Sequence, residues 1–143
     1  KMVCEPRRLV ECQVAALAAA RASAKDIAAM REAAPFIPEH DDPEVDALEC
    51  IRANREFHDC VAKAARNEML EKVVLTALDQ DNQPYFFGID LHSCTSPEKI
   101  TEEHMVSVDA IEQRDADLAR ERSHEHLKTK EQRIIRAWGE QGL

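Results

Sequence analysis

The stretch Asn54-Arg55-Glu56-Phe57-His58 decides how this chain of 143 residues folds. It lies inside a long helical pattern that begins at Pro43. Asn54 and His58 are four residues apart, so they stack on one face of a helix. The other residues of that face are apolar: Ile51, Val61 and Ala65. Because burying an unpaired polar side chain costs about 1–3 kcal/mol, we expect both residues to find partners in the core.

The composition favours helices. Glycine (3 residues) and aromatic residues (4%) are scarce, and no segment alternates as a strand or hairpin does. Capping signals and apolar periodicity predict helices over 4–22, 23–34, 43–65, 67–78, 96–113 and 115–138. Residues 79–95, which include His92, lack helical periodicity. The sequence therefore predicts an all-α fold, a single antiparallel bundle of about six helices in one domain.

Charge and cysteine content exclude several classes of protein. The net charge of −9 has the wrong sign for a nucleic-acid-binding surface, which needs clustered Lys and Arg. No run of about 18 apolar residues is present, and the start shows no signal peptide, so we expect no membrane span. Five cysteines without paired spacing indicate reduced thiols and a cytoplasmic protein. Metal ligation by Cys50 and Cys60 is a weaker alternative.

Two further histidines occupy inward positions on the helices expected near the end of the chain. His104 shares an apolar stripe with Ile100, Val108 and Ile111. His126 shares a stripe with Ala119 and Ser123. His124 lies about 200° around the helix from His126 and is therefore expected to face outward. The pattern predicts a buried polar site of His58, His104 and His126, with Asn54 beside them.

Three neutral imidazoles from three helices can form a metal site that leaves coordination positions open. Imidazole nitrogen suits Zn, Ni, Fe or Cu. The Asn54 carbonyl oxygen can coordinate, but without charge, so a divalent site would retain a charge of +2 and favour a carboxylate ligand. The histidines can equally be hydrogen-bonded core residues in a metal-free structural bundle. A third alternative is a metal-dependent hydrolase-like enzyme, because an open three-histidine site can activate water. No inward carboxylate is placed as its general base, so we expect no enzyme activity.

Arg7 and Glu11 form an i, i+4 pair in the first expected helix. The simpler interpretation is a surface contact that stabilises the helix by about 0.2–0.5 kcal/mol. The functional interpretation places Arg7 at the rim of a ligand cavity. Spacing alone favours the surface contact.

Several motifs accompany these residues along almost the whole chain. The opening motif is Arg7-Arg8-Leu9-Val10-Glu11, followed by Ala15, Leu17 and Ala18. The central motif is Asn54-Arg55-Glu56-Phe57-His58, followed by Ala64 and by Asn67-Glu68-Met69-Leu70. The closing motif runs through Glu103-His104, Ala110-Ile111, Asp115, Ala119 and His126-Leu127. Together they resemble the FCD domain, the C-terminal effector-binding domain of GntR-family bacterial transcription regulators, in the FadR subfamily.

The resemblance implies a metal site and an effector. The family's ligands are one Asp and three His, which correspond here to Asn54, His58, His104 and His126; Asn54 therefore departs from the family's Asp. It implies zinc or nickel, which helps to bind the carboxylate of a small organic acid, with Arg7 as an effector contact. It also implies a homodimer whose DNA binding changes allosterically with the effector. DNA contact would be made by an N-terminal winged helix-turn-helix, which we expect to be absent from this chain.

Overall fold

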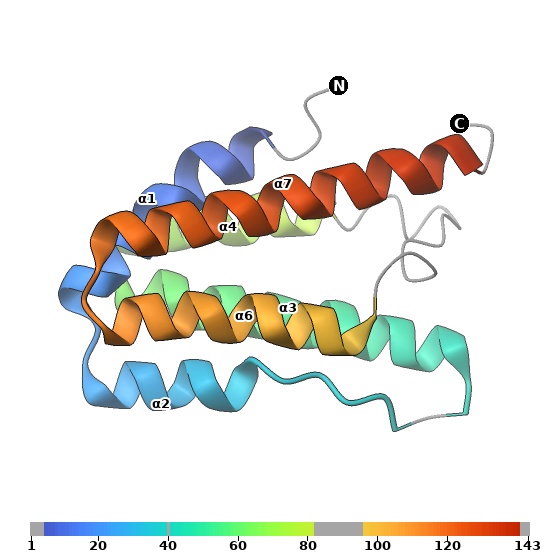
Figure 1. Ribbon diagram of the computed structural model, residues 1–143, viewed down its shortest axis with the longest axis horizontal. Coiled ribbons are helices and arrows are strands. Elements are labelled where there is room, and N and C mark those ends of the chain that lie inside the picture. Colours follow the sequence, from blue (N-terminus) through green and yellow to red (C-terminus); the bar gives the residue numbers. More distant parts are fainter. Residues whose placement is uncertain (1–4, 40, 82–95, 141–143) are drawn as a thin grey trace.

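Six helices make up the described part of the chain, which is residues 5–39, 41–81 and 96–140 of the computed structural model. They are α1 (Glu5–Arg21), α2 (Ala24–Ala33), α3 (Pro43–Ala64), α4 (Glu68–Asp81), α6 (Pro97–Glu112) and α7 (Ala116–Glu140). Successive helices run in opposite directions along the long axis of the molecule (Figure 1). No strand occurs among these residues, and the predicted all-α antiparallel bundle is confirmed.

The helices begin where the capping residues predict. Ser23 and Asp26 form a reciprocal capping box at the start of α2. Ser96 accepts a hydrogen bond from the Lys99 amide ahead of Pro97 at the start of α6. Asn67 and Asp115 cap α4 and α7 in the same way. Local side-chain chemistry therefore sets the boundaries of these helices.

The largest difference from the predicted boundaries is at the end of α4. Helix α4 continues to Asp81, so the expectation of a non-helical segment from residue 79 is wrong for its first three residues. Asp81 is buried and meets Arg7 from α1, and this contact favours the extra helical residues. The rest of that segment, 82–95 with His92, lies outside the described residues, as does His40.

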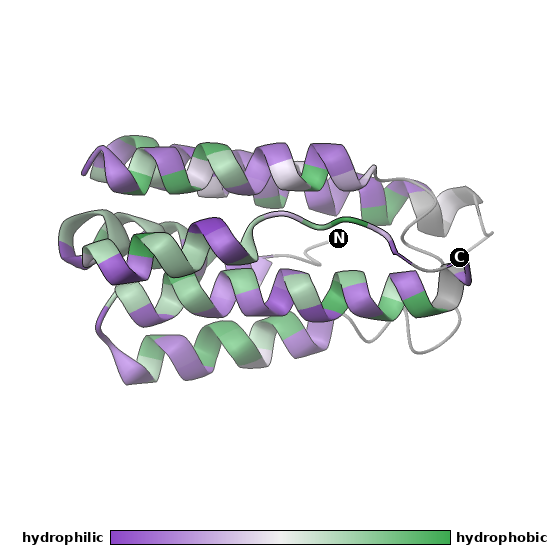
Figure 2. Cartoon of the chain, turned by 90° about the horizontal axis from the view of Figure 1, so that it is seen from below, coloured by the Kyte–Doolittle hydropathy of each residue, from purple (hydrophilic) through white to green (hydrophobic). Residues whose placement is uncertain are grey.

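Helix α1 is central to the packing. It packs most extensively against α7 and also contacts α3, α4 and α6. Four of its eight buried residues are alanines, whose small side chains let the neighbouring helices approach closely: Ala15, Ala16, Ala18 and Ala19. Polar and apolar residues interleave along the helices (Figure 2), as amphipathic helices of a bundle require. The core around α1 therefore brings α3, α6 and α7 together.

A search of the described helices finds none with an apolar stretch long enough to cross a bilayer.

Candidate metal centre

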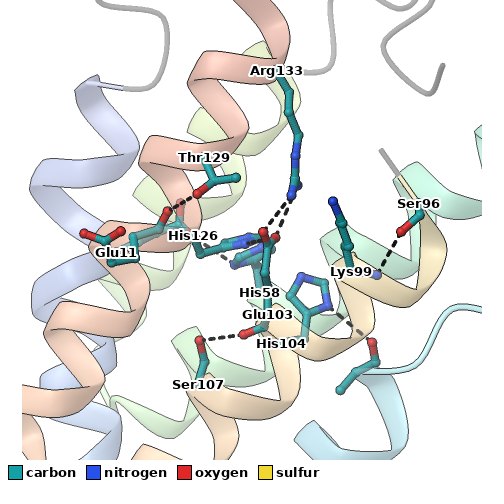
Figure 3. Close-up of polar contacts among 12 residues, drawn as sticks. Glu11, His58, Ser96, Lys99, Glu103, His104, Ser107, His126, Thr129 and Arg133 are labelled. Carbon is teal, nitrogen blue, oxygen red and sulfur yellow. Dashed lines mark hydrogen bonds and ion pairs between the residues drawn. The ribbon is translucent and has the colours of Figure 1, made fainter. Parts of the chain in front are cut away.

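Three histidines from three helices meet in the core of the bundle. His58 lies on α3, His104 on α6 and His126 on α7, and all three are buried. Each offers one ring nitrogen that lies within 4.8 Å of the other two. Their ring centroids are 5.2–5.4 Å apart, and the side chains converge in Figure 3. The expected inward positions are thus confirmed, and His124 is exposed as expected.

The Nδ1 atom of each ring faces a hydrogen-bond acceptor. His58 Nδ1 lies 2.8 Å from Glu11 Oε1, and His126 Nδ1 lies 2.9 Å from Glu103 Oε2. His104 Nδ1 lies 3.3 Å from the backbone carbonyl oxygen of Ala34. Ionised carboxylates and carbonyls only accept, so Nδ1 carries the proton in all three rings. Each Nε2 atom is therefore unprotonated and carries a lone pair.

Two of these lone pairs have no protein partner among the described residues, and the third has only a long contact. Nε2 of His104 and Nε2 of His126 are buried without a hydrogen-bond partner in the part of the chain that the structure describes. Nε2 of His58 faces a guanidinium nitrogen of Arg7 at 3.4 Å, a long contact. Buried acceptors without partners are unfavourable, and a cation would satisfy them. Three neutral imidazoles with Nδ1 partners fit a transition metal such as zinc or nickel.

The electrostatics of the site keep the imidazoles neutral. Burial lowers the pKa of His58 to about 4, against the raising effect of Glu11. Burial also lowers the pKa of His104 and of His126. At neutral pH all three rings are therefore uncharged, which is the form that ligates metals.

The two carboxylates that orient the rings are held in their ionised form. Burial alone would raise the pKa of Glu11, but the charge of Arg7 and the contact with His58 hold that pKa well below its usual range. Burial likewise opposes ionisation of Glu103, and hydrogen bonds from His126 and Arg133 lower its pKa. Both groups therefore remain acceptors for Nδ1–H.

Arg7 and Glu11 are buried, so their interpretation as a surface contact is wrong. Arg7 is fully buried and contacts Glu11, and its Nη1 donates to Asp81 Oδ2 at 2.9 Å. Burial would lower the pKa of the Arg7 guanidinium, but Glu11 and Asp81 raise it. A signal was present in the sequence, because Arg7 and Glu11 continue the stripe of Val14 and Ala18 at steps of four, three and four.

Asn54 lies on α3 one turn before His58 and is half-buried. The side-chain amide of Asn54 makes no hydrogen bond to the described residues. Cys50 is a buried free thiol and Cys60 a half-buried one, and neither belongs to the histidine cluster. The structure thus brings the three predicted histidine ligands together, and neither cysteine belongs to their cluster.

A small cavity of about 20 Å³ adjoins His58 and His126. Its polar lining consists of Glu11, His58, His126, Ser107 and Ser123. Its apolar lining is formed by Val14, Ala15, Phe57, Val61, Val74 and Ile111. A volume of this size holds about one water molecule. Anything larger must displace side chains to enter.

The buried neutral histidines should make the metal-free domain less stable as the pH falls. In the unfolded chain His58 binds a proton near its ordinary pKa of 6.5, whereas in the folded chain it does so near 4. The stability that neutral His58 contributes is complete above pH 6.5. About 3 kcal/mol of it is lost as the pH falls from 6.5 to 4. We expect chemical denaturation in a chelating buffer to show this decline, and His58→Gln to flatten it.

His124→Gln is the matched control, because it removes an exposed histidine from the same helix as His126. Its pH profile should follow that of the unmodified domain. A His58→Gln profile as steep as that of the unmodified domain would contradict the assignment of His58 as a buried neutral ring.

Comparison with known proteins agrees with this architecture. A search of curated proteins finds no match to the chain. The family model of the FCD domain matches residues 3–129, which include α1, all three histidines and Arg7. This match covers most of the 143 residues. The chain therefore belongs to the FCD domain family, the C-terminal effector-binding domains of GntR-family transcription regulators.

Proposed function

We propose that this domain senses a small carboxylate-bearing metabolite through a divalent metal bound by His58, His104 and His126. Asn54 stands at the position of the fourth ligand. The observation that carries the proposal is that one ring nitrogen of each histidine lies within 4.8 Å of the other two, while the Nδ1 partners of all three rings are acceptors. Such outer hydrogen bonds are typical of metal-ligating histidines.

The metal would be zinc or nickel, since both accept neutral imidazole nitrogen. When bound, it supplies a positive charge of +2 that none of the three histidines compensates. Asn54 is neutral as well, so the charge at the site remains and attracts an anion. A carboxylate is the simplest anion to complete the coordination shell.

Arg7 is the proposed second contact for the effector. Its guanidinium lies 3.4 Å from His58 Nε2, beside the point where the lone pairs converge. Arg7 binds Glu11 and Asp81 in the structure. An effector carboxylate would share or replace one of these bonds, because the planar fork of a guanidinium binds carboxylates with two N–H groups.

The size of the cavity supports allosteric coupling. The cavity holds about one water molecule, and it is lined by residues of α1, α3, α4, α6 and α7. An organic acid of several non-hydrogen atoms does not fit without moving some of these side chains or helices. Ligand binding would therefore favour a second arrangement of the bundle, and this differential affinity is the source of the coupling.

DNA binding would belong to an N-terminal winged helix-turn-helix domain outside these 143 residues. The net charge of −9 makes this domain itself unsuited to bind DNA. We propose that the regulator belongs to the FadR subfamily and acts in the cytoplasm. We also propose that it is a homodimer, since dimers read two half-sites of an operator.

The metal site is tested by metal content and titration of purified protein. We expect the unmodified domain to bind about one zinc or nickel ion. His126→Gln should weaken binding by more than the 10–100-fold typical of losing an outer hydrogen-bond partner, since it removes a ligand. His124→Gln, two residues away and exposed, should bind as the unmodified domain does.

Absence of binding after incubation of the unmodified domain with zinc and with nickel would contradict the metal proposal. So would equal affinity in His126→Gln and His124→Gln. Either result would favour the metal-free structural bundle, with the histidines as hydrogen-bonded core residues.

The effector class is tested by thermal unfolding of the metal-loaded domain with pairs of acids and their amides. A ligand at about 100 times its Kd stabilises by about 2.7 kcal/mol, so acetate and lactate at such concentrations should raise Tm by about 5–10 °C. Acetamide and lactamide have nearly the same shape without the charge, and they should leave Tm unchanged. Equal shifts for an acid and its amide would exclude recognition through the carboxylate.

A further inference from the structure

We propose that Glu103 and Arg133 act as a positioning pair that fixes the imidazole of His126 for metal binding. The inference rests on the metal site proposed above. It assigns a role to two residues for which neither the histidine pattern nor the family match gives one.

The three side chains form one chain of hydrogen bonds between α6 and α7. Glu103 Oε2 accepts from His126 Nδ1 at 2.9 Å. Arg133 Nη2 donates to Glu103 Oε1 at 2.8 Å, and its Nη1 lies 3.3 Å from Oε2. Figure 3 shows Glu103 between the ring and the guanidinium. The carboxylate is therefore fixed on one side by Arg133 and fixes the ring on the other.

The side chains of the pair are largely shielded from solvent, with 22% of Glu103 and 19% of Arg133 exposed. His126 and Arg133 are seven residues apart on α7, so they lie on the same face two turns apart. Shielding strengthens the hydrogen bonds relative to those of an exposed pair.

His58 has a comparable arrangement on the opposite side of the site. Glu11 accepts from His58 Nδ1, and Arg7 contacts Glu11. Two of the three rings are thus oriented by a carboxylate that is itself bound to an arginine. The repetition, on different helices, indicates that orienting the rings is a property of the site rather than of one surface contact.

The pair has a specific electrostatic consequence. Glu103 and Arg133 together are neutral, so the pair orients His126 without adding net charge near a divalent cation. Glu103→Gln would weaken the orientation and also leave the Arg133 charge uncompensated close to the metal. Removing Arg133 as well would abolish that repulsion. The effect of Arg133→Gln should therefore depend on whether Glu103 is present.

The experiment measures metal affinity by competition with a chromophoric chelator, using zinc as the probe, in the unmodified domain, E103Q, R133Q and the double variant. We expect E103Q to bind zinc 10–100-fold more weakly, because losing an outer hydrogen-bond partner typically lowers metal affinity by that factor. R133Q should bind several-fold more weakly. The double variant should bind at least as tightly as E103Q.

E102Q and R136Q are the matched controls, since each changes an exposed neighbour of the same type on the same helix. Both should bind zinc as the unmodified domain does. The visible absorption spectrum of the cobalt-substituted protein provides a second measurement. Its bands should change in E103Q and R133Q and stay constant in the controls, because they report ligand geometry. Thermal unfolding without metal verifies that each variant folds.

Affinity and cobalt spectrum of E103Q equal to those of E102Q would overturn the inference while leaving the metal site intact. An R133Q effect of the same size with and without Glu103 would overturn it as well, because Arg133 would then act independently. Tighter zinc binding in R133Q would show that its charge outweighs any orientation and would also overturn it. Failure of the unmodified domain to bind metal would instead contradict the proposed function itself.

Discussion

The structure of the site depends on the hydrogen-bond acceptors at the Nδ1 atoms of three buried histidines. Glu11, Glu103 and the Ala34 carbonyl come from α1, α6 and the end of α2, so the rings are oriented only when the bundle is assembled. Acceptors at Nδ1 fix the tautomer and turn three lone pairs toward one point. Buried lone pairs without a hydrogen-bond partner are energetically unfavourable, and a bound cation would satisfy them.

Buried charged side chains surround the rings. Arg7 binds Glu11 and Asp81, and Lys130 lies 4.0 Å from Asp81, so charges from α1, α4 and α7 meet next to His58. Buried ion pairs are often no more stabilising than apolar residues of the same size, whereas removing one partner is costly. Their presence here links the orientation of His58 to the positions of several helices. A ligand that competes for Arg7 would act on all of these contacts together.

The sequence predicted the helices and the inward histidines because both follow from local chemistry. Caps mark helix starts, and a polar residue on an apolar stripe must face the core, as His104 does between Ile100 and Val108. The outer partners were missed because they depend on packing between helices. Glu103 lies beside His104 in the sequence, and only the approach of α7 makes it a partner of His126. Arg7 continued an apolar stripe, but its spacing to Glu11 equally fits a surface pair.

The most direct measurement of the central claim is the tautomeric state of the three histidines, from long-range ¹H–¹⁵N correlation spectra of the metal-free domain at neutral pH. The account predicts that His58, His104 and His126 carry the proton on Nδ1 and a lone pair on Nε2. The Nε2 signals of all three should shift when zinc is added. Protonated Nε2 atoms in the metal-free domain, or Nε2 signals that zinc leaves unchanged, would contradict it.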